Sequence, residues 1–332
     1  MGSISKNWFL LALLATLARF SVQAAPAVNG PETDPYFSAR WFGTVTAYKT
    51  AVPRHDDFPP PFEGYDPNET NIKIDHALIV GGIMVGTLTA VHIYQRNAWW
   101  SGDRVPFHVQ DDPEYALNVD KAGHFYGGAI TSYLSQRMFQ WAGMSVESSV
   151  WGGFAFGSIF ELYVEVEDGF APDWGFSPSD AIADVVGAAW PVGQYYVPAL
   201  QHFQPKFSYY PSDRAQAGKH EGNAIDDYGG QTYWMGIHVD KLLPSDIEPY
   251  WPDWLGIAVG ISVRDYITDD HGIDQENIHS NVILALDYDM EEILPGDSWF
   301  MKALKQGLNY IHFPSPAIRI SPSFIAYGLY FY

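Results

Sequence analysis

The sequence predicts an α+β fold in which an apolar bundle of about four helices is followed by an antiparallel β-sheet region. Residues 72–204 carry long apolar stretches with helix-start signals, which favour a helical bundle. Residues 205–332 carry short apolar runs bounded by Pro, Gly and Asp, which are typical of strands. The 332 residues, 47% of them hydrophobic, are sufficient to build a core.

The composition excludes several classes of protein. There are 39 acidic and 18 basic residues, so the net charge of −21 repels nucleic-acid phosphates, and we expect no nucleic-acid partner. Because the chain has no cysteine, disulfides, thiolate metal sites and an acyl-cysteine anchor are excluded. A metal ion would have to be held by His and carboxylate groups. The aromatic content of 16% is typical of proteins that meet a membrane interface.

Residues 1–25 are predicted to be a signal peptide. Lys6 precedes an apolar run over residues 8–15 that is too short to span a bilayer, and Ala24 offers a small residue near the cleavage point. An uncleaved anchor is the alternative. Residues 26–71 are rich in Pro, Gly, Asp and aromatic residues without periodicity, which predicts an extended N-terminal arm. We therefore expect an exported protein.

The four predicted helices cover residues 77–94, 120–142, 148–167 and 179–201. The first has no charged residue, and a membrane helix and a buried core helix fit it equally well. The fourth has a clear start, because Ser177 can cap it and Pro178 suits its first position. Pro191 and Pro198 are expected to kink or shorten its far half.

The predicted strands cover residues 207–210, 231–242, 255–266, 282–290 and 317–332, with a short helix at 298–310. In the second strand Tyr233, Met235 and Ile237 share a face that we expect to be the dry one, while Trp234 and Gly236 share the mixed face. A packed sheet is the first interpretation. A membrane-embedded sheet is the alternative, although about five strands are fewer than the about eight of the smallest barrels.

Charged residues interrupt the predicted helices at helical spacing. They are Asp120, Lys121, His124, Glu161, Glu165, Asp168, Asp180 and Asp184. If they converge, Lys121, His124, protons or a divalent cation must offset the repulsion between the carboxylates. Such spacing is also common on solvated helix faces, so a cap role for Asp180 and a core position for His124 are the alternative.

A convergent cluster would suit catalysis or metal binding. The candidate catalytic residues are Asp120, His124, Glu165, Asp168, Asp180 and Asp184, and the candidate metal ligands are His124, Glu165, Asp168 and Asp180. His124 would act as base or ligand, and Lys121 would supply the counter-charge. Oxygen-rich ligation with one imidazole would suit a divalent cation such as Mg, Mn or Zn.

Several segments resemble a known family. They are DKAGHF (120–125), EVEDGF (165–170), WGFS (174–177), PKFSY (205–209), GQTYW (230–234), WLGIAVG (254–260) and LALDYD (284–289). With them, residues 72–332 resemble the YfiM-like family of predicted periplasmic lipoproteins, a domain family of unknown function. The resemblance implies a place in the periplasm or at the outer membrane of a Gram-negative bacterium.

The chain departs from that family in two ways. It lacks the lipobox cysteine of the short members, so their lipid anchor does not carry over. At Asp184 many relatives have Asn, which puts a role that needs a charge there in doubt. The pattern from Asp120 to His124 with the later acids is also similar, more weakly, to the VanZ-like membrane proteins of glycopeptide resistance.

Three functions are consistent with these observations. The first is a non-catalytic, membrane-associated protein of the cell envelope, with the membrane or an envelope lipid as its partner. The second is a metal-dependent hydrolase or transferase that acts on an envelope lipid or a cell-wall substrate. In the third the cluster is a structural cation site or a buried polar network that fixes helix register. We take the first as the prediction and the second as the alternative.

Overall fold

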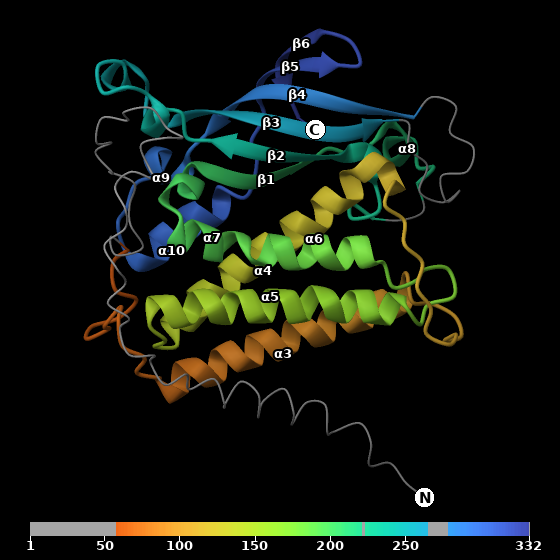
Figure 1. Ribbon diagram of the computed structural model, residues 1–332, viewed down its shortest axis with the longest axis horizontal. Helices are drawn as coiled ribbons and strands as arrows, with labels where there is room; N and C mark the ends of the chain where they lie inside the picture. Colours follow the sequence, from red (N-terminus) through yellow and green to blue (C-terminus); the bar gives the residue numbers. More distant parts are fainter. Residues whose placement is uncertain (1–57, 221–222, 265–277, 332) are drawn as a thin grey trace, which may run out of the picture. The chain divides into compact units, whose positions relative to one another are not determined.

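A computed structural model describes residues 58–220, 223–264 and 278–331 (Figure 1). All of these residues belong to the unit Ala51–Tyr332. The predicted signal peptide, residues 1–25, and the predicted arm up to residue 57 lie outside the described residues.

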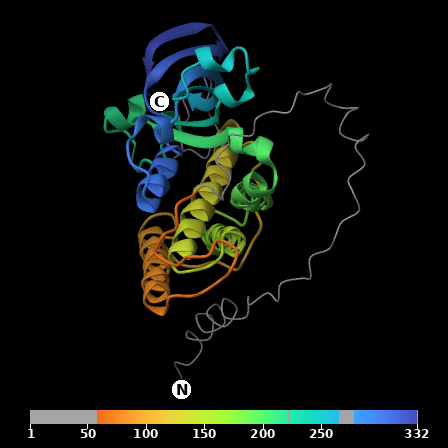
Figure 2. The same ribbon diagram turned by 90° about the vertical axis from the view of Figure 1, so that its left-hand side faces the viewer.

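The described residues form the predicted α+β fold, with helices followed by an antiparallel sheet (Figures 1 and 2). The α-helices are α3 (Ile74–Asn97), α4 (Val119–Trp141), α5 (Val146–Asp168), α6 (Pro178–Ala188), α7 (Trp190–Tyr196), α8 (Asp213–Gln216), α9 (Met290–Ile293) and α10 (Trp299–Leu308). The strands are β1 (Phe203–Tyr209), β2 (Gln231–Ile237), β3 (Leu255–Arg264), β4 (His279–Tyr288), β5 (Ser315–Ser321) and β6 (Ile325–Tyr330).

Helices α4, α5 and α6 approach one another closely because glycines lie at their crossings. A Cβ atom on Gly187 of α6 would lie 2.0 Å from the Phe125 carbonyl oxygen of α4. A Cβ atom on Gly153 of α5 would lie 2.4 Å from the Ser132 carbonyl oxygen, again on α4. Any larger residue would separate the backbones. These contacts set the distance between the three helices that carry the charged residues.

The fourth predicted helix is divided in the structure. Helix α6 ends at Ala188, α7 begins at Trp190, and a 3-10 helix follows at Pro198–His202. Pro191 and Pro198 lie at the starts of the two later segments. A backbone N–H at the start of a helix has no partner within the helix, so a proline there removes no hydrogen bond. The expected effect of the two prolines is therefore observed.

Helix α3 is not a core helix of the described unit. It packs through Val80 and Met84 against Trp141 at the end of α4 and against Phe156 of α5. Most of its other apolar side chains are exposed, and Leu78 has 72% of its surface accessible. Among the described residues α3 alone has the length and apolar composition of a helix that crosses a membrane.

The sheet has six strands in the order β1-β2-β3-β4-β5-β6, with every neighbouring pair antiparallel. The prediction of one strand over residues 317–332 was wrong, because the chain reverses after Ser321 to form the β5–β6 hairpin. Pro322 has no N–H for a ladder hydrogen bond, and Ser323 favours a turn. The second strand is also shorter than predicted and ends at Ile237.

The sheet buries the face that the sequence indicated as mixed. Trp234 and Gly236 of β2 are buried, whereas Tyr233, Met235 and Ile237 are only partly buried. The hydroxyl group of Tyr330 on β6 accepts a hydrogen bond of 2.9 Å from Arg264 of β3, and its ring packs on Trp234. The sheet therefore curls around this face, which we call the inner face. The opposite one is the outer face.

Candidate functional site

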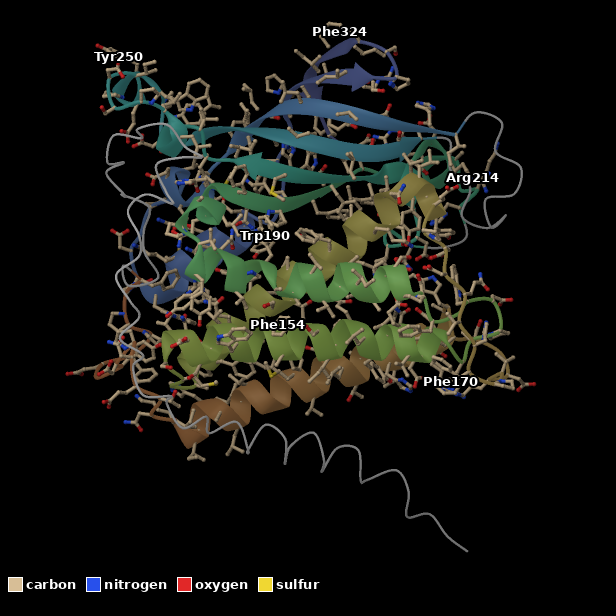
Figure 3. All side chains as sticks on the ribbon, viewed as in Figure 1. Phe154, Phe170, Trp190, Arg214, Tyr250 and Phe324 are labelled. Atoms are coloured by element: carbon tan, nitrogen blue, oxygen red, sulfur yellow. The ribbon has the colours of Figure 1, made fainter. Side chains whose placement is uncertain are left out.

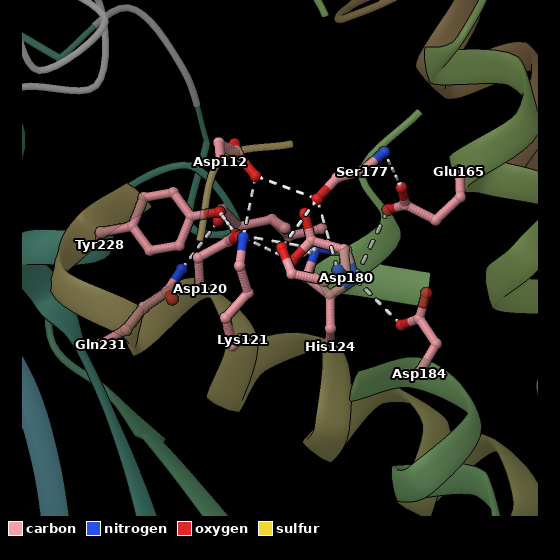
Figure 4. Close-up of polar contacts among 12 residues, drawn as sticks. Asp112, Asp120, Lys121, His124, Glu165, Ser177, Asp180, Asp184, Tyr228 and Gln231 are labelled. Atoms are coloured by element: carbon pink, nitrogen blue, oxygen red, sulfur yellow. Dashed lines mark hydrogen bonds and ion pairs between the residues drawn. The ribbon is translucent and has the colours of Figure 1, made fainter. Parts of the chain in front are cut away.

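Helices α4, α5 and α6 bring most of the predicted site residues together (Figure 4). Helix α4 supplies Asp120, Lys121 and His124 from its first two turns. Glu165 comes from the last turn of α5, and Asp180 and Asp184 come from α6. The side chains of His124 and of these four acids form what we call the His124 centre.

Local sequence signals position two of the contributing helices. The Ser177 hydroxyl accepts a 3.4 Å hydrogen bond from the backbone N–H of Asp180, as predicted for a helix cap. Before α4 the chain turns sharply, and Ala116, Leu117 and Asn118 adopt φ values of 46°, 52° and 69°. Left-handed backbone is unfavourable for residues other than glycine, and such strain collects at sites that need a fixed geometry.

Each ring nitrogen of His124 faces a pair of carboxylates. Nδ1 lies 3.0 Å from Asp184 Oδ1 and 3.7 Å from Glu165 Oε1. Nε2 lies 3.7 Å from Asp120 Oδ1 and 3.8 Å from Asp180 Oδ1. The four carboxylates are buried, but 25% of the His124 side chain is accessible. The imidazole is therefore the part of the centre that faces the outside.

Lys121 joins the acids on one side of the centre. Its Nζ atom lies 2.6 Å from Asp180 Oδ1 and 2.9 Å from oxygens of both Asp120 and Asp112. The role of counter-charge that the sequence predicted for Lys121 agrees with this position. Three carboxylates share one ammonium group, so charge remains to be offset elsewhere.

Protons offset part of the remaining charge. Burial raises the pKa of Glu165 to about 9, and burial together with the charge of Asp120 raises the pKa of Asp180 to about 7. Burial by itself would lower the pKa of His124, but the hydrogen bond with Asp184 and the charges of Asp120 and Asp180 hold it well above 6.5. Burial opposes ionisation of Asp120, yet His124 and Lys121 lower its pKa. The raised pKa of Glu165 favours its neutral form at neutral pH, and the raised pKa of His124 favours the charged imidazolium.

Two overlapping sets of side chains could hold a metal ion. Asp120, His124 and Asp180 form one set, and His124, Glu165 and Asp184 form the other, with the ligand atoms of each within 4.8 Å of one another. Asp184 is fully buried, and its Oδ2 atom has no hydrogen-bond partner among the described residues. An unsatisfied buried carboxylate oxygen is costly unless a proton or a cation reaches it. The donor set of imidazole and carboxylates suits a divalent cation.

Two predicted residues lie beside the centre and belong to neither set. Asp168 accepts a hydrogen bond from the indole of Trp100, just beyond the end of α3, and burial raises its pKa to about 6. Glu161 accepts a hydrogen bond of 3.4 Å from Thr131 on α4, and burial raises its pKa to about 8. The assignment of Asp168 as a metal ligand remains a prediction.

The sequence did not indicate three residues that border the centre. Asp112 contacts Lys121 and accepts a 3.1 Å hydrogen bond from Ser177. Tyr228 donates a hydrogen bond to Asp120 from a 3-10 helix next to β2. Gln231 lies nearby on β2 (Figure 4). Asp112 resembled an ordinary turn acid, and Tyr228 and Gln231 come from the strand half, more than 100 residues further along the chain.

The comparisons with known proteins add no relative. The sequence matches no protein-family model, no curated protein and no solved structure. The resemblance to the YfiM-like family therefore remains a prediction.

Proposed function

We propose that this chain is an exported, membrane-associated protein of the bacterial cell envelope and that α3 contacts the lipid. The exposed apolar surface of α3 carries the proposal. Leu78 and Ile83 are 72% and 49% accessible, and in a water-soluble bundle such side chains would be buried against other helices.

The ends of α3 agree with a lipid contact. Lys73 precedes its first residue, Arg96 lies in its last turn, and Trp99 follows two residues beyond its end. Basic and aromatic residues at the two ends of an apolar helix are typical of membrane interfaces. The family resemblance supports the periplasm or outer membrane as the location.

Fractionation tests the proposed membrane contact. The wild-type protein should stay in the membrane pellet after a carbonate wash, and a larger fraction of the double variant Leu78→Lys/Ile83→Lys should be released. The control variant Ser101→Lys/Gln110→Lys adds the same charge at exposed loop positions and should stay in the pellet. Release of the wild-type protein by the wash would overturn the proposal.

A metal-dependent hydrolase or transferase that acts on an envelope lipid or cell-wall substrate is the second proposed function. The unsatisfied Oδ2 atom of Asp184 and the two sets of potential ligands that share His124 favour it. A bound divalent cation would supply Lewis acidity and lower the pKa of a bound water. Asp184 would orient the imidazole by accepting a hydrogen bond from Nδ1, Lys121 would offset Asp120 and Asp180, and Glu165 would hold a proton beside the ring.

Elemental analysis of the purified protein tests the second function. We expect a stoichiometric divalent metal in the wild-type protein and its loss in His124→Ala and Asp180→Ala. Asp253→Asn is the control, because Asp253 is an exposed acid that belongs to neither ligand set, and it should keep the metal. A metal-free wild-type protein whose melting temperature does not respond to chelation would overturn this function and favour a structural polar network.

A further inference from the structure

All charged side chains of the six strands lie on the inner face of the sheet. They are Lys206, Arg264, Asp287 and Arg319, and His279 shares the same face. Lys206 is fully buried there and forms an ion pair with Asp287, with 2.8 Å between Nζ and Oδ2. Arg264 bonds Tyr330, and Arg319 bonds Asn281. The curled sheet thus encloses these charged groups beside an apolar cluster that includes Trp234, Ile283 and Tyr330.

The side chains on the outer face are apolar, both within single strands and between neighbouring strands. The strand register aligns Met235, Val259, Leu284, Ile318 and Ala326 in one row across β2 to β6. The neighbouring row runs through Tyr233, Ile261 and Val282. Between the strand ends the outer face of β3 and β4 carries only Ile, Val and Leu.

Residues of α4 and of the segment before it cover the outer face on β1 and β2 and at the Val263 end of β3. Tyr126 of α4 packs on Phe207 of β1 and on Tyr233 of β2. On β3 and β4, by contrast, Val259 is 42% accessible and Leu284 is 36% accessible. The rest of the outer face, on β3 to β6, is exposed, and we call it the uncovered surface.

The strands that carry this surface are about as long as the hydrocarbon layer of a membrane is thick. Strands β3 and β4 have 10 residues each, and at about 3.3 Å per residue they extend about 33 Å, close to the hydrocarbon thickness of about 30 Å. Trp254 and Tyr288 pack together at one end of the strands, with ring centroids 6.2 Å apart. Phe324 lies exposed at the tip of the β5–β6 hairpin (Figure 3).

We propose that the uncovered surface of β3 to β6 lies against the acyl chains of the membrane that α3 contacts. Its apolar outside, with every charged strand residue on the inside, agrees with the polarity of sheets that face lipid. A protein partner would need hydrogen bonds and a polar rim, at about one hydrogen bond per 100–200 Å². At the rim of this surface Trp254 and Phe324 are exposed instead, and such aromatic residues are typical of a membrane interface, which favours lipid over a second copy. The inference rests on the proposed membrane association and needs no catalytic role for the His124 centre.

Fluorescence quenching of single-cysteine variants tests the inference, since the chain has no native cysteine. Leu284→Cys and Val259→Cys place a label on the sheet, Leu78→Cys places one on α3, and Lys219→Cys places one on an exposed loop. Each labelled full-length protein is reconstituted into phosphatidylcholine/phosphatidylglycerol vesicles. Lipids brominated in mid-chain should quench the labels at 284, 259 and 78 several-fold more than the label at 219, and aqueous iodide should show the reverse order.

The possible outcomes separate the two proposals. Quenching at 78 by brominated lipid, with iodide access at 284 and 259, would overturn the lipid contact of the sheet and leave membrane association intact. Shielding of 284 and 259 from both quenchers would place a protein partner on this surface and would also overturn the inference. Iodide access at all four positions would overturn both proposals.

Discussion

At the scale of single residues, the His124 centre depends on a shortage of positive charge. Lys121 and His124 face four buried carboxylates, and Asp112 borders Lys121 as well. Two bases cannot neutralise all of these acids, so raised pKa values of the acids are the expected consequence. The proton content of the centre and its cation affinity are therefore linked, because a metal ion must displace protons to bind.

Lys121 should be the residue whose loss is most costly. In Lys121→Met the carboxylates of Asp120 and Asp180 would stay buried without their shared cation, and stability should fall by about 3–5 kcal/mol. Adding Asp180→Asn to Lys121→Met should recover part of the lost stability. A double-mutant cycle, built from the free energies of unfolding in denaturant titrations in detergent, measures the coupling between the two residues. Lys219→Met is the control at an exposed position and should have little effect. Equal losses with and without Asp180→Asn would contradict the shared-cation account.

Glu161 should make the protein less stable as the pH rises. Burial raises its pKa from 4.5 to about 8. Between these values the unfolded chain binds fewer protons than the folded chain, so the contribution of Glu161 is present below the unfolded pKa and is lost as the pH rises towards the folded one. We expect a loss of about 2 kcal/mol between about pH 5 and about pH 7.

Glu161→Gln isolates this contribution, because the amide keeps the shape of the side chain and does not titrate. Glu165, Asp180 and His124 shift stability in the same direction, so the variant should retain a smaller slope and not a flat profile. Chemical denaturation across this pH range makes the comparison. Identical pH profiles for the wild type and Glu161→Gln would show that Glu161 is ionised in the folded protein.

At the scale of secondary-structure elements, glycines decide how closely the site helices approach. Gly187→Ala should push α6 away from α4, since its Cβ atom would lie 2.0 Å from the Phe125 carbonyl oxygen. We expect a loss of about 1–3 kcal/mol or more, together with a weaker metal affinity of the His124 centre. Gly82→Ala on α3 has open space around it and should be neutral or stabilising by up to about 1 kcal/mol. Thermal melts of the two variants make the comparison, and equal effects would contradict it.

The sequence predicted helices better than strand faces, for a physical reason. Helical spacing and the Ser177 cap placed α4, α5 and the start of α6 within a few residues. For β2 the period of two showed that Tyr233 and Met235 share a face, but periodicity alone cannot say which face is enclosed. The curl of the sheet, and hence the burial of Trp234, depends on Tyr330 from the other end of the strand region.

For the His124 centre, too, local sequence patterns predicted contacts within one helix but not contacts between distant elements. Spacing grouped Asp120 with His124 and Asp180 with Asp184, because residues of one helix that are four apart share a face. It could not show that Asp168 would pair with Trp100, or that Tyr228 would reach Asp120. Those contacts depend on how distant elements pack, which one sequence does not encode in local patterns.

At the scale of the whole described unit, the helical and strand halves form one body. The Tyr126 hydroxyl of α4 donates a 3.0 Å hydrogen bond to the Tyr310 carbonyl oxygen, and the Tyr133 hydroxyl donates a 2.8 Å bond to the Ala303 carbonyl oxygen of α10. Tyr228 also connects the strand half to Asp120 in the centre. The boundary predicted near residue 205 is therefore crossed by buried contacts.

These contacts predict a single cooperative unfolding transition. Loss of helix, followed by far-UV circular dichroism, and exposure of the sheet, followed by a label on Leu284→Cys, should share one midpoint in denaturant. Tyr126→Phe removes one of the bridging hydrogen bonds and should lower both midpoints together, by about 1 kcal/mol of stability. Tyr250→Phe, at a highly exposed position, is the control. Separate midpoints would mean that the halves unfold independently. In that case the hydrogen bond from Tyr228 to Asp120 could break while α4, α5 and α6 stayed folded. Coinciding midpoints would instead show that the strand half and the His124 centre unfold together.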